Sequence, residues 1–425
     1  GGYDPYTGYL YGEILEKIER NHVYKLFCRF TQKTAKFKLN LTVCPWEYLP
    51  PQAEEVKGEV KMTNCYMVAP GGRVDIPTEN VYKIWAQQVE FGNIPIPDGD
   101  VMAELVWQDE QGVIADGGIT VVNALERERA YLQVRTAKEG NAVVAMKVNG
   151  EIYWSWHIWC TDYEPNVTEG QKFFNNLVWM DRNLGAMTNE YTIDGGVKGL
   201  FYQWGRKDPF SGSLTYDGIR TILYDVRSGQ VVYKYSDERV TAGQAISTPS
   251  SLYSPRRGLG SESWCTKTTE LKYLWGNPDG EQDVFPKETL KSLYDPCPYG
   301  YKVAPHDVFK ILSKGEIAIF PPAGASLGDM YFIKSYFANG STFYYDNAGI
   351  DETKLIYLPE TYRPNGDGIK LGKRGVYWCS SPHPADKEHS GLMFNFHPYT
   401  AMDFEYNIYN PVVTSTPASI RCVKE

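Results

Sequence analysis

The chain from residue 176 onward contains a series of short segments rich in aromatic residues, glycine and proline, and this feature restricts the fold most. They are residues 176–186 (NLVWMDRNLGA), 202–210 (YQWGRKDPF), 295–303 (DPCPYGYKV), 377–381 (YWCSS) and 420–425 (IRCVKE). Tryptophan and tyrosine bury large rings, whereas glycine and proline permit or impose turns. Segments that combine them are typical of a compact domain in which the chain turns repeatedly around buried rings.

In this order the segments resemble the Fibrobacter succinogenes major paralogous domain, a module of bacterial surface proteins that is similar to C-type lectin-like folds. The resemblance covers residues 165–425. It implies an α+β C-type lectin-like domain that recognises a ligand and does not transform it, with no cofactor. It also implies a Cys297–Cys422 disulfide closing a loop of 125 residues, for which the chain-entropy description gives roughly 4–5 kcal/mol of stability.

The other six cysteines are dispersed and none forms a CxxC pair, so the usual zinc spacing is missing from the sequence. An even, dispersed set permits disulfides. Cys265 and Cys379 are the second candidate pair, although Cys379 stands where the family pattern would have a small residue such as serine. Disulfides would place the chain outside the cytosol.

Residues 1–47 are predicted to be the closing strands of a β domain. Residues 23–30 and 35–43 are rich in β-forming residues, and the second run alternates strictly between apolar and polar positions. This region resembles the last strands of fimbrillin domains in Bacteroidetes pili. Since two strands are not stable alone in water, we expect partner strands from chain preceding Gly1, from another domain or from a neighbouring pilus subunit. The proline-rich residues 45–55 then form an extended linker.

Residues 58–162 are predicted to form an immunoglobulin-like β-sandwich. The strongest signal is Asn149-Gly150 between two β-prone runs, residues 142–148 and 151–159, because both turn residues accept a positive φ. The second run is apolar on both faces, so we expect a central strand that also touches the next domain. Shorter strands are predicted near residues 81–86, 103–108, 118–122 and 130–136.

Within residues 165–425, two helices are predicted at residues 286–293 and 305–312, where proline stands at the first turn of each. Residues 187–270 and 323–370 show little periodicity and are predicted to be mainly loops, which in compact domains tend to be functional.

The composition excludes several classes of function. A net charge of −9 argues against a nucleic-acid partner, and no apolar run is long enough to span a membrane. The chain carries no recognised catalytic motif, so we assign no catalytic residue and no metal ligand.

His157 is interpreted as a packed, hydrogen-bonded residue. Residues 277–283 lack the ligand alternation of a calcium loop, and Glu164-Pro165-Asn166 matches the lectin triplet at the wrong place.

Together with the unpartnered N-terminal strands and the long loops, the two resemblances imply a cell-surface adhesin, a fimbrial tip or tip-like subunit of a Bacteroidetes-type pilus, that binds a glycan or protein ligand through residues 165–425. It would be extracellular, in a fimbrium associated with the outer membrane. A surface glycan-binding protein outside any pilus is the alternative; a formylglycine-generating type of enzyme, with Cys379 as its reactive residue, is a less favoured one. The sequence does not identify the ligand-binding residues, although Tyr344, Tyr345, Trp275 and Tyr399 are candidates for stacking on sugars.

Overall fold

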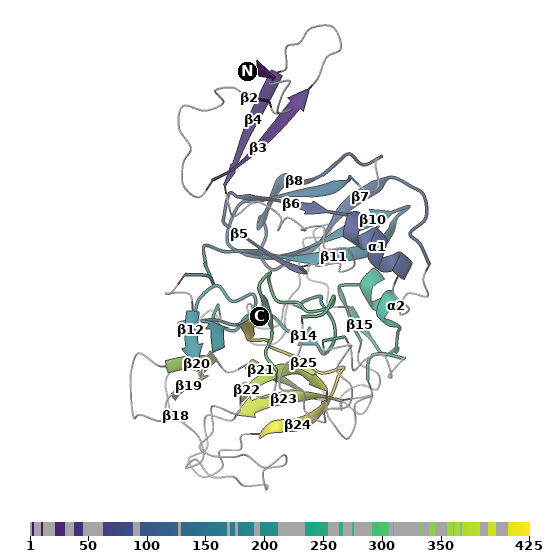
Figure 1. Cartoon of the computed structure of the whole chain (residues 1–425). Helices are drawn as coiled ribbons and strands as arrows, with labels where there is room; N and C mark the ends of the chain where they lie inside the picture. Colours follow the sequence, from purple (N-terminus) through teal and green to yellow (C-terminus); the bar gives the residue numbers. More distant parts are fainter. Residues whose placement is uncertain are drawn as a thin grey trace. The chain divides into compact units, whose positions relative to one another are not determined.

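The computed structural model of the chain consists of two compact units, Gly1–Gly58 (unit 1) and Glu59–Glu425 (unit 2) (Figure 1). It is mainly β-structure arranged in several small sheets, which agrees with the predicted mainly-β class. The structure describes residues 2–3, 10–11, 22–29, 38–45, 63–87, 94–125, 129–167, 171–174, 177–190, 196–210, 234–253, 263–266, 274–275, 291–305, 309, 332–333, 340–344, 355–359, 361–365, 368–382, 390–396 and 407–425.

Unit 1 contains two separate two-stranded antiparallel sheets. Strands β1 (Gly2–Tyr3) and β2 (Leu10–Tyr11) form the first sheet. Strands β3 (His22–Arg29) and β4 (Lys38–Pro45) form the second, in continuous register from His22 opposite Pro45 to Arg29 opposite Lys38. The two predicted strands of this region are therefore confirmed, with their ends shifted by a few residues.

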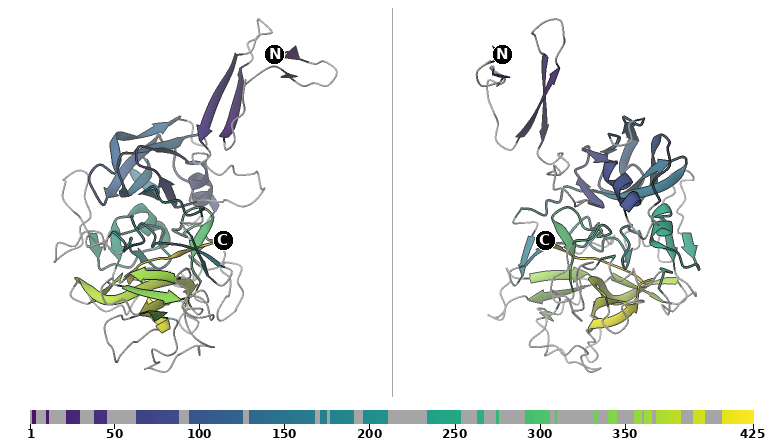
Figure 2. Two further views of the ribbon diagram at one scale, coloured as in Figure 1. Left: turned by 90° about the vertical axis from the view of Figure 1, so that its left-hand side faces the viewer. Right: turned by 45° about the vertical axis from the view of Figure 1, so that its right-hand side comes forward.

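The first part of unit 2 consists of two sheets whose facing sides share a hydrophobic core. A four-stranded sheet has the order β5–β11–β10–β7 and a three-stranded sheet has the order β6–β9–β8 (Figures 1 and 2). The strands are β5 (Cys65–Val68), β6 (Arg73–Pro77), β7 (Val101–Gln108), β8 (Ile114–Val122), β9 (Tyr131–Thr136), β10 (Gly140–Val148) and β11 (Glu151–Cys160).

The hairpin predicted at Asn149-Gly150 is confirmed. Asn149 and Gly150 have φ values of 51° and 88°, the positive values that a tight two-residue hairpin turn requires. Strand β11 pairs with β10 on one side and in parallel with β5 on the other. It is therefore central, as its two-sided apolar pattern predicted, and every residue from Trp154 to Cys160 is buried.

One predicted strand is wrong. Residues 81–86 lie within helix α1 (Glu79–Gln87). The buried residues Val81, Ile84 and Trp85 follow the spacing of one helical face, and Glu79 pairs with Lys83 one turn later. Helical periodicity and this ion pair outweigh the β propensity of the individual residues.

The remainder of unit 2 brings the sequence segments described above into contact. Strands β13 (Leu177–Met180), β26 (Cys422–Lys424) and β17 (Tyr301–Val303) are neighbours in one sheet, with β12 (Gln171–Phe174) at its edge. The other strands are β14 (Tyr202–Gln203), β15 (Lys234–Ser236), β16 (Ser251–Tyr253), β18 (Phe332–Ile333), β19 (Gly340–Tyr344), β20 (Leu355–Pro359), β21 (Thr361–Asn365), β22 (Gly368–Pro382), β23 (Ser390–Phe396), β24 (Asn407–Val413) and β25 (Pro417–Ala418).

Helix α2 (Ala242–Ser247) was not predicted. It begins with a capping box in which Thr241 and Gln244 satisfy each other's backbone N–H groups. Of the predicted helix at 286–293, only residues 291–293 are described and they are not helical; of the one at 305–312, the described Phe309 is helical. The predicted loop stretches 187–270 and 323–370 hold α2 and several short strands.

Tryptophan side chains dominate a core that runs without interruption from the β5–β11–β10–β7 sheet into the rest of unit 2. The Nε1 groups of Trp204, Trp264 and Trp378 donate to the carbonyls of Cys379, Trp204 and Tyr202 at 2.8–2.9 Å. Buried rings whose polar atoms are satisfied at fixed carbonyls hold the backbone firmly.

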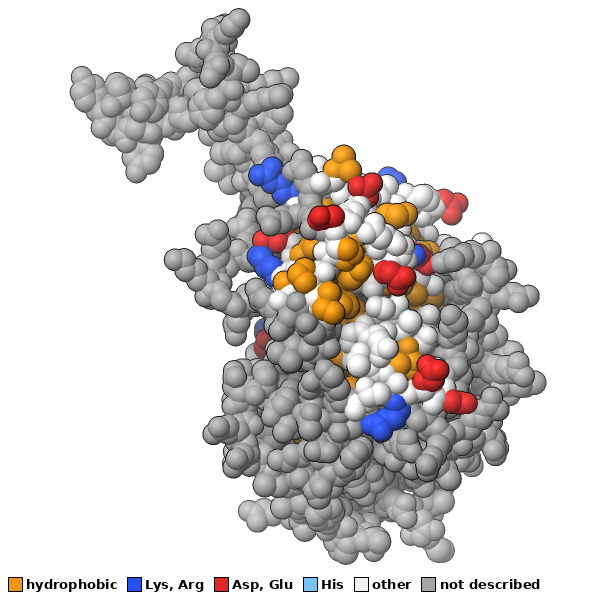
Figure 3. Space-filling view, turned by 90° about the vertical axis from the view of Figure 1, so that its right-hand side faces the viewer, with side chains coloured by type: hydrophobic (Ala, Val, Ile, Leu, Met, Phe, Trp, Pro, Cys, Tyr) orange, Lys and Arg blue, Asp and Glu red, His pale blue; other side chains and the backbone are white. Residues whose placement is uncertain are grey.

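Large hydrophobic side chains are exposed at only a few described positions of unit 2. Figure 3 shows one face, on which hydrophobic side chains lie among acidic and basic ones. Scattered exposed hydrophobic residues are normal for a protein surface. The exposed residues are Ile94, Met102, Leu125, Val167 and Tyr299.

Candidate functional site

A disulfide between Cys297 and Cys422, the pair that the family resemblance implied, joins the turn before β17 to strand β26. Both cysteines are fully buried, and β17 pairs with β26 at Val303 opposite Cys422. The bond therefore fastens the end of the chain to the 295–303 segment, beside a regular strand pair.

The second candidate pair, Cys265 and Cys379, is not formed. Both residues are buried and carry thiols. Their backbones are fixed by different partners, since Cys265 bridges Val240 and the Cys379 carbonyl accepts from the Trp204 indole. This pairing was therefore wrong: Cys265 lies in an isolated bridge to Val240, and Cys379 lies in β22.

A tight turn follows Cys297 and projects an aromatic side chain. The Tyr301 N–H donates to the Pro298 carbonyl at 3.1 Å, and Gly300 has a φ of +77°. A positive φ at the third residue is what a type II turn requires, and glycine adopts it without strain. Tyr299, at the second position, is 59 % exposed.

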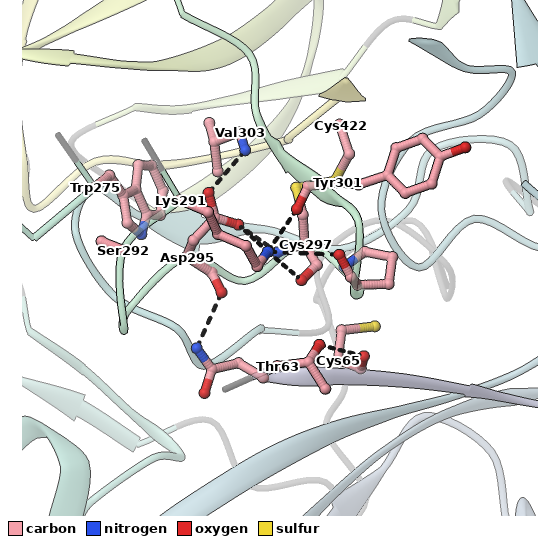
Figure 4. A network of polar contacts seen from close by, with 12 residues as sticks. Thr63, Cys65, Trp275, Lys291, Ser292, Asp295, Cys297, Tyr301, Val303 and Cys422 are labelled. Carbon is pink, nitrogen blue, oxygen red and sulfur yellow. Dashed lines mark hydrogen bonds and ion pairs between the residues drawn. A yellow bond between two sulfur atoms is a disulfide. The ribbon is translucent and has the colours of Figure 1, made fainter. Parts of the chain in front are cut away.

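Lys291 and Asp295 form hydrogen bonds with the backbone in and beside this turn (Figure 4). The Lys291 ammonium donates to the carbonyls of Cys297 and Tyr301 at 2.8 and 2.5 Å and to Asp295 Oδ1 at 3.1 Å. Asp295 in turn accepts from the Cys297 and Val303 N–H groups at 2.8 and 2.9 Å. The ammonium and the carboxylate thus bond each other and also bond backbone groups in and beside the turn. These charge-assisted hydrogen bonds fix the conformation of the turn.

Asn64 anchors the same segment to the β5–β11–β10–β7 sheet. Its Nδ2 donates to the carbonyls of Leu293 and Asp295 at 2.7 and 3.0 Å, and its Oδ1 accepts from Trp154 Nε1 at 3.0 Å. Cys65, the next residue, forms a bridge with Pro298. The turn therefore rests on the start of strand β5, which lies more than two hundred residues earlier in the chain.

His157 connects the sheet to the following segment at a second point. It is 1 % exposed and bonds Asn141 Oδ1 through Nε2 at 2.9 Å, with the Tyr202 hydroxyl 3.5 Å from Nδ1. Asn141 Nδ2 donates to Asp109 at 2.7 Å and to the Gly185 carbonyl at 3.0 Å. The interpretation of His157 as packed and hydrogen-bonded is confirmed.

Stability should depend on pH through this network. Burial lowers the pKa of His157 to about 3 and raises the pKa of Asp109 to about 6. The neutral imidazole therefore contributes stability above its ordinary pKa of 6.5, and this is lost as pH falls toward 3. The Asp109 carboxyl has the opposite effect: as pH falls from 6 to its ordinary pKa of 3.8, its protonation stabilises the folded protein. The effects of His157 and Asp109 on stability therefore partly cancel in this pH range.

We expect the stability difference between wild type and His157→Gln to shrink on acidification from pH 6.5 to 3, by on the order of 4 kcal/mol. Urea unfolding of both proteins at several pH values measures it. Asp109→Asn is the matched variant: without the opposing carboxyl, it should lose stability more steeply than wild type between pH 6 and 4. Parallel profiles for all three proteins would contradict this account.

Other buried charges of unit 2 are also engaged in structural bonds. Lys207 Nζ donates to Asp208 Oδ1, to Ser155 Oγ and to the Ser155 carbonyl at 2.6, 2.6 and 2.8 Å, and Ser155 Oγ donates to Asp208. Burial lowers the pKa of Lys207, while Asp208 opposes the shift. A serine beside a lysine resembles a nucleophile and its base, but neither side chain is open to solvent. A cavity next to them has about 10 Å³ of space, room for one water molecule.

None of the aromatic residues proposed for sugar stacking is Tyr299, the aromatic residue found exposed at the turn after Cys297. Trp275 is fully buried, donates to the Tyr294 carbonyl and packs 5.7 Å from Trp204, so that candidate was wrong. Tyr345, Tyr399 and the side chain of Tyr344 lie outside the described residues, as does the 277–283 run. Tyr299 was missed, although its position before Gly300 in a Pro-Tyr-Gly turn is a signal of exposure.

The described residues contain no group of three or more potential metal ligands and no helix long and apolar enough to cross a membrane. No family model, curated protein or solved structure matches the chain.

Proposed function

We propose that the chain is a cell-surface adhesin, a fimbrial tip or tip-like subunit, and that unit 2 contacts a ligand on a host or bacterial surface. In this proposal residues 1–47 close a fimbrillin-like domain, residues 58–162 form an immunoglobulin-like spacer, and residues 165–425 form the C-type lectin-like recognition module. The proposed location is the outside of the cell, in an outer-membrane-associated fimbrium.

The observation that carries the proposal is the braced turn with Tyr299 at its tip. Tyrosine supplies a large contact area at a low entropic cost, and binding gains most when the contact residue is already held in place. The disulfide, Lys291 and Asp295 fix the backbone on both sides of Tyr299. A residue that is rigidly held and still largely exposed suits recognition by stacking on a sugar or packing against a protein.

The engagement of buried ionisable groups supports the same conclusion. Lys207, Asp208, Lys291 and Asp295 each bond groups inside unit 2. Such groups stabilise the fold of unit 2, and in this proposal the exposed residues of unit 2 contact the ligand.

Tyr299→Ala should weaken adhesion without destabilising the protein. We expect binding to drop about tenfold or more, the result of losing roughly 1.4 kcal/mol of contact energy, while the unfolding free energy changes by less than about 0.5 kcal/mol. Flow cytometry of cells incubated with the fluorescent full chain measures the binding, with a glycan array to identify sugars. Leu125→Ala, which removes another exposed side chain, is the matched control, and Tyr299→Trp should retain binding. Unchanged adhesion of Tyr299→Ala would reject this turn as the contact site.

The alternative, a surface glycan-binding protein that does not assemble, also draws on Tyr299. Co-purification with fimbriae separates the two: a chain that binds glycans but never accompanies a fimbrial subunit fits the alternative.

A further inference from the structure

The segment that forms the β3–β4 sheet has a charge unlike the rest of the chain. Between Arg20 and Trp46 there are six lysine and arginine residues and no aspartate or glutamate, a formal charge of +6. The whole chain carries −9, so the remaining residues together carry −15. Unit 1 therefore presents a basic sheet within an acidic protein.

The register of β3 and β4 places all the charged residues of the two strands on one face. Directly opposed residues share a face, and neighbours along a strand alternate between faces. One face therefore carries Lys25, Arg29 and Lys38, together with the apolar Val23 and Phe27, and Arg29 is directly opposite Lys38. Like charges in opposed positions destabilise a strand pair, so this face favours added negative charge. The other face carries Tyr24, Leu26, Cys28, Leu39, Leu41 and Val43.

In the described part of the chain, no third strand pairs with either edge of this sheet. Among the residues that the structure describes, β3 and β4 pair only with each other. A two-stranded sheet is at best marginally stable, and its outer N–H and C=O groups are a template for an added strand. Within the described part of the chain, neither strand therefore has a second main-chain partner.

An extended segment whose residues alternate between apolar and acidic would pair with an edge of the sheet, extend the apolar face and place carboxylates beside the basic residues, because successive side chains of a strand lie on opposite faces. We propose that the β3–β4 sheet accepts a strand of this kind, apolar residues alternating with aspartate or glutamate, from a partner subunit. The inference rests on the proposed pilus role and adds the chemistry of the partner segment. The main-chain bonds give the strand its affinity, and the acidic residues select it over other apolar strands.

Fluorescent peptides of about ten residues, the length of a long strand, test this with the full chain. In one peptide valine alternates with glutamate, in the second valine alternates with lysine, and the third has the first composition in blocks. Anisotropy should show the alternating glutamate peptide binding at least tenfold more tightly than either other peptide, and more weakly as salt rises.

Two variants sharpen the test. Lys25→Glu combined with Arg29→Glu should transfer the preference to the lysine peptide, and the milder Lys25→Gln with Arg29→Gln should abolish the preference. Lys83→Glu, a single charge reversal in unit 2, should leave the preference unchanged. Equal binding of the block peptide would mean a non-specific anion surface and would overturn strand addition; equal binding of the lysine peptide would overturn the charge selection.

The outcome is separable from the fate of the proposed function. A chain that accompanies fimbriae but shows no preference among the peptides rejects the inference alone. A chain that selects the alternating glutamate peptide but never accompanies fimbriae rejects the pilus role alone.

Discussion

Residues 165–425 produced without the preceding strands are expected to remain unfolded or to aggregate. Their core continues into the β5–β11–β10–β7 sheet, whose Trp154, Trp156 and Trp159 are at most 1 % exposed. Removing the sheet exposes the aromatic residues that pack against it. It also takes away the Ser155 oxygens to which Lys207 donates and the Asn141 amide that donates to the Gly185 carbonyl. Each buried polar group left unpaired costs about 1–3 kcal/mol, and a few such losses equal a typical total stability of about 5–15 kcal/mol.

Proton NMR dispersion and near-ultraviolet circular dichroism of the fragment measure this. Residues 59–425, which lack only unit 1, are the control and should give a dispersed spectrum and a cooperative transition. A fragment 165–425 that unfolds cooperatively from a well-dispersed native state would contradict a shared core.

Loss of the disulfide is expected to have the second largest effect. Cys422→Ser should lower the unfolding free energy by about 4 kcal/mol, because the unfolded chain gains the freedom of a loop of 125 residues. The turn that carries Tyr299 should also become less rigid. Adhesion should therefore fall even though the Tyr299 side chain itself is unchanged and still exposed.

Urea unfolding of the two single variants and the double variant measures the effect. Because either substitution breaks the same bond, Cys297→Ser, Cys422→Ser and the double variant should lose similar amounts, far from additive. Cys65→Ser, which changes a nearby buried thiol, is the control and should lose clearly less. Single losses that add up in the double variant would show that the bond does not form in the native protein.

Features set by neighbouring residues were predictable from the sequence. Asn149-Gly150 determines its hairpin because both residues accept a positive φ, and the two-sided apolar pattern of residues 151–159 requires a central strand. Residues 81–86 show the limit of propensity: their β-forming residues lie at helical spacing, and the burial of Val81, Ile84 and Trp85 decides the outcome.

Features set by distant residues were not predictable in the same way. The Cys297–Cys422 pair followed from family resemblance, since spacing alone permits many pairings. Trp275 and Tyr299 are both aromatic residues near turns, yet one is buried and the other 59 % exposed. The difference depends on Trp204 and Tyr294, which are brought to Trp275 by the tertiary fold. Asn64 likewise reaches Leu293 and Asp295 across more than two hundred residues.

Hydrogen exchange of the full chain in its native state tests the central claim, that residues 59–425 form one rigid scaffold, most directly. Amides of β11, β13 and β26 should exchange only through unfolding of the whole unit, with protection free energies that agree within about 1 kcal/mol. Exchange of β13 and β26 at a much lower free energy than β11 would show two independent bodies and would contradict the account.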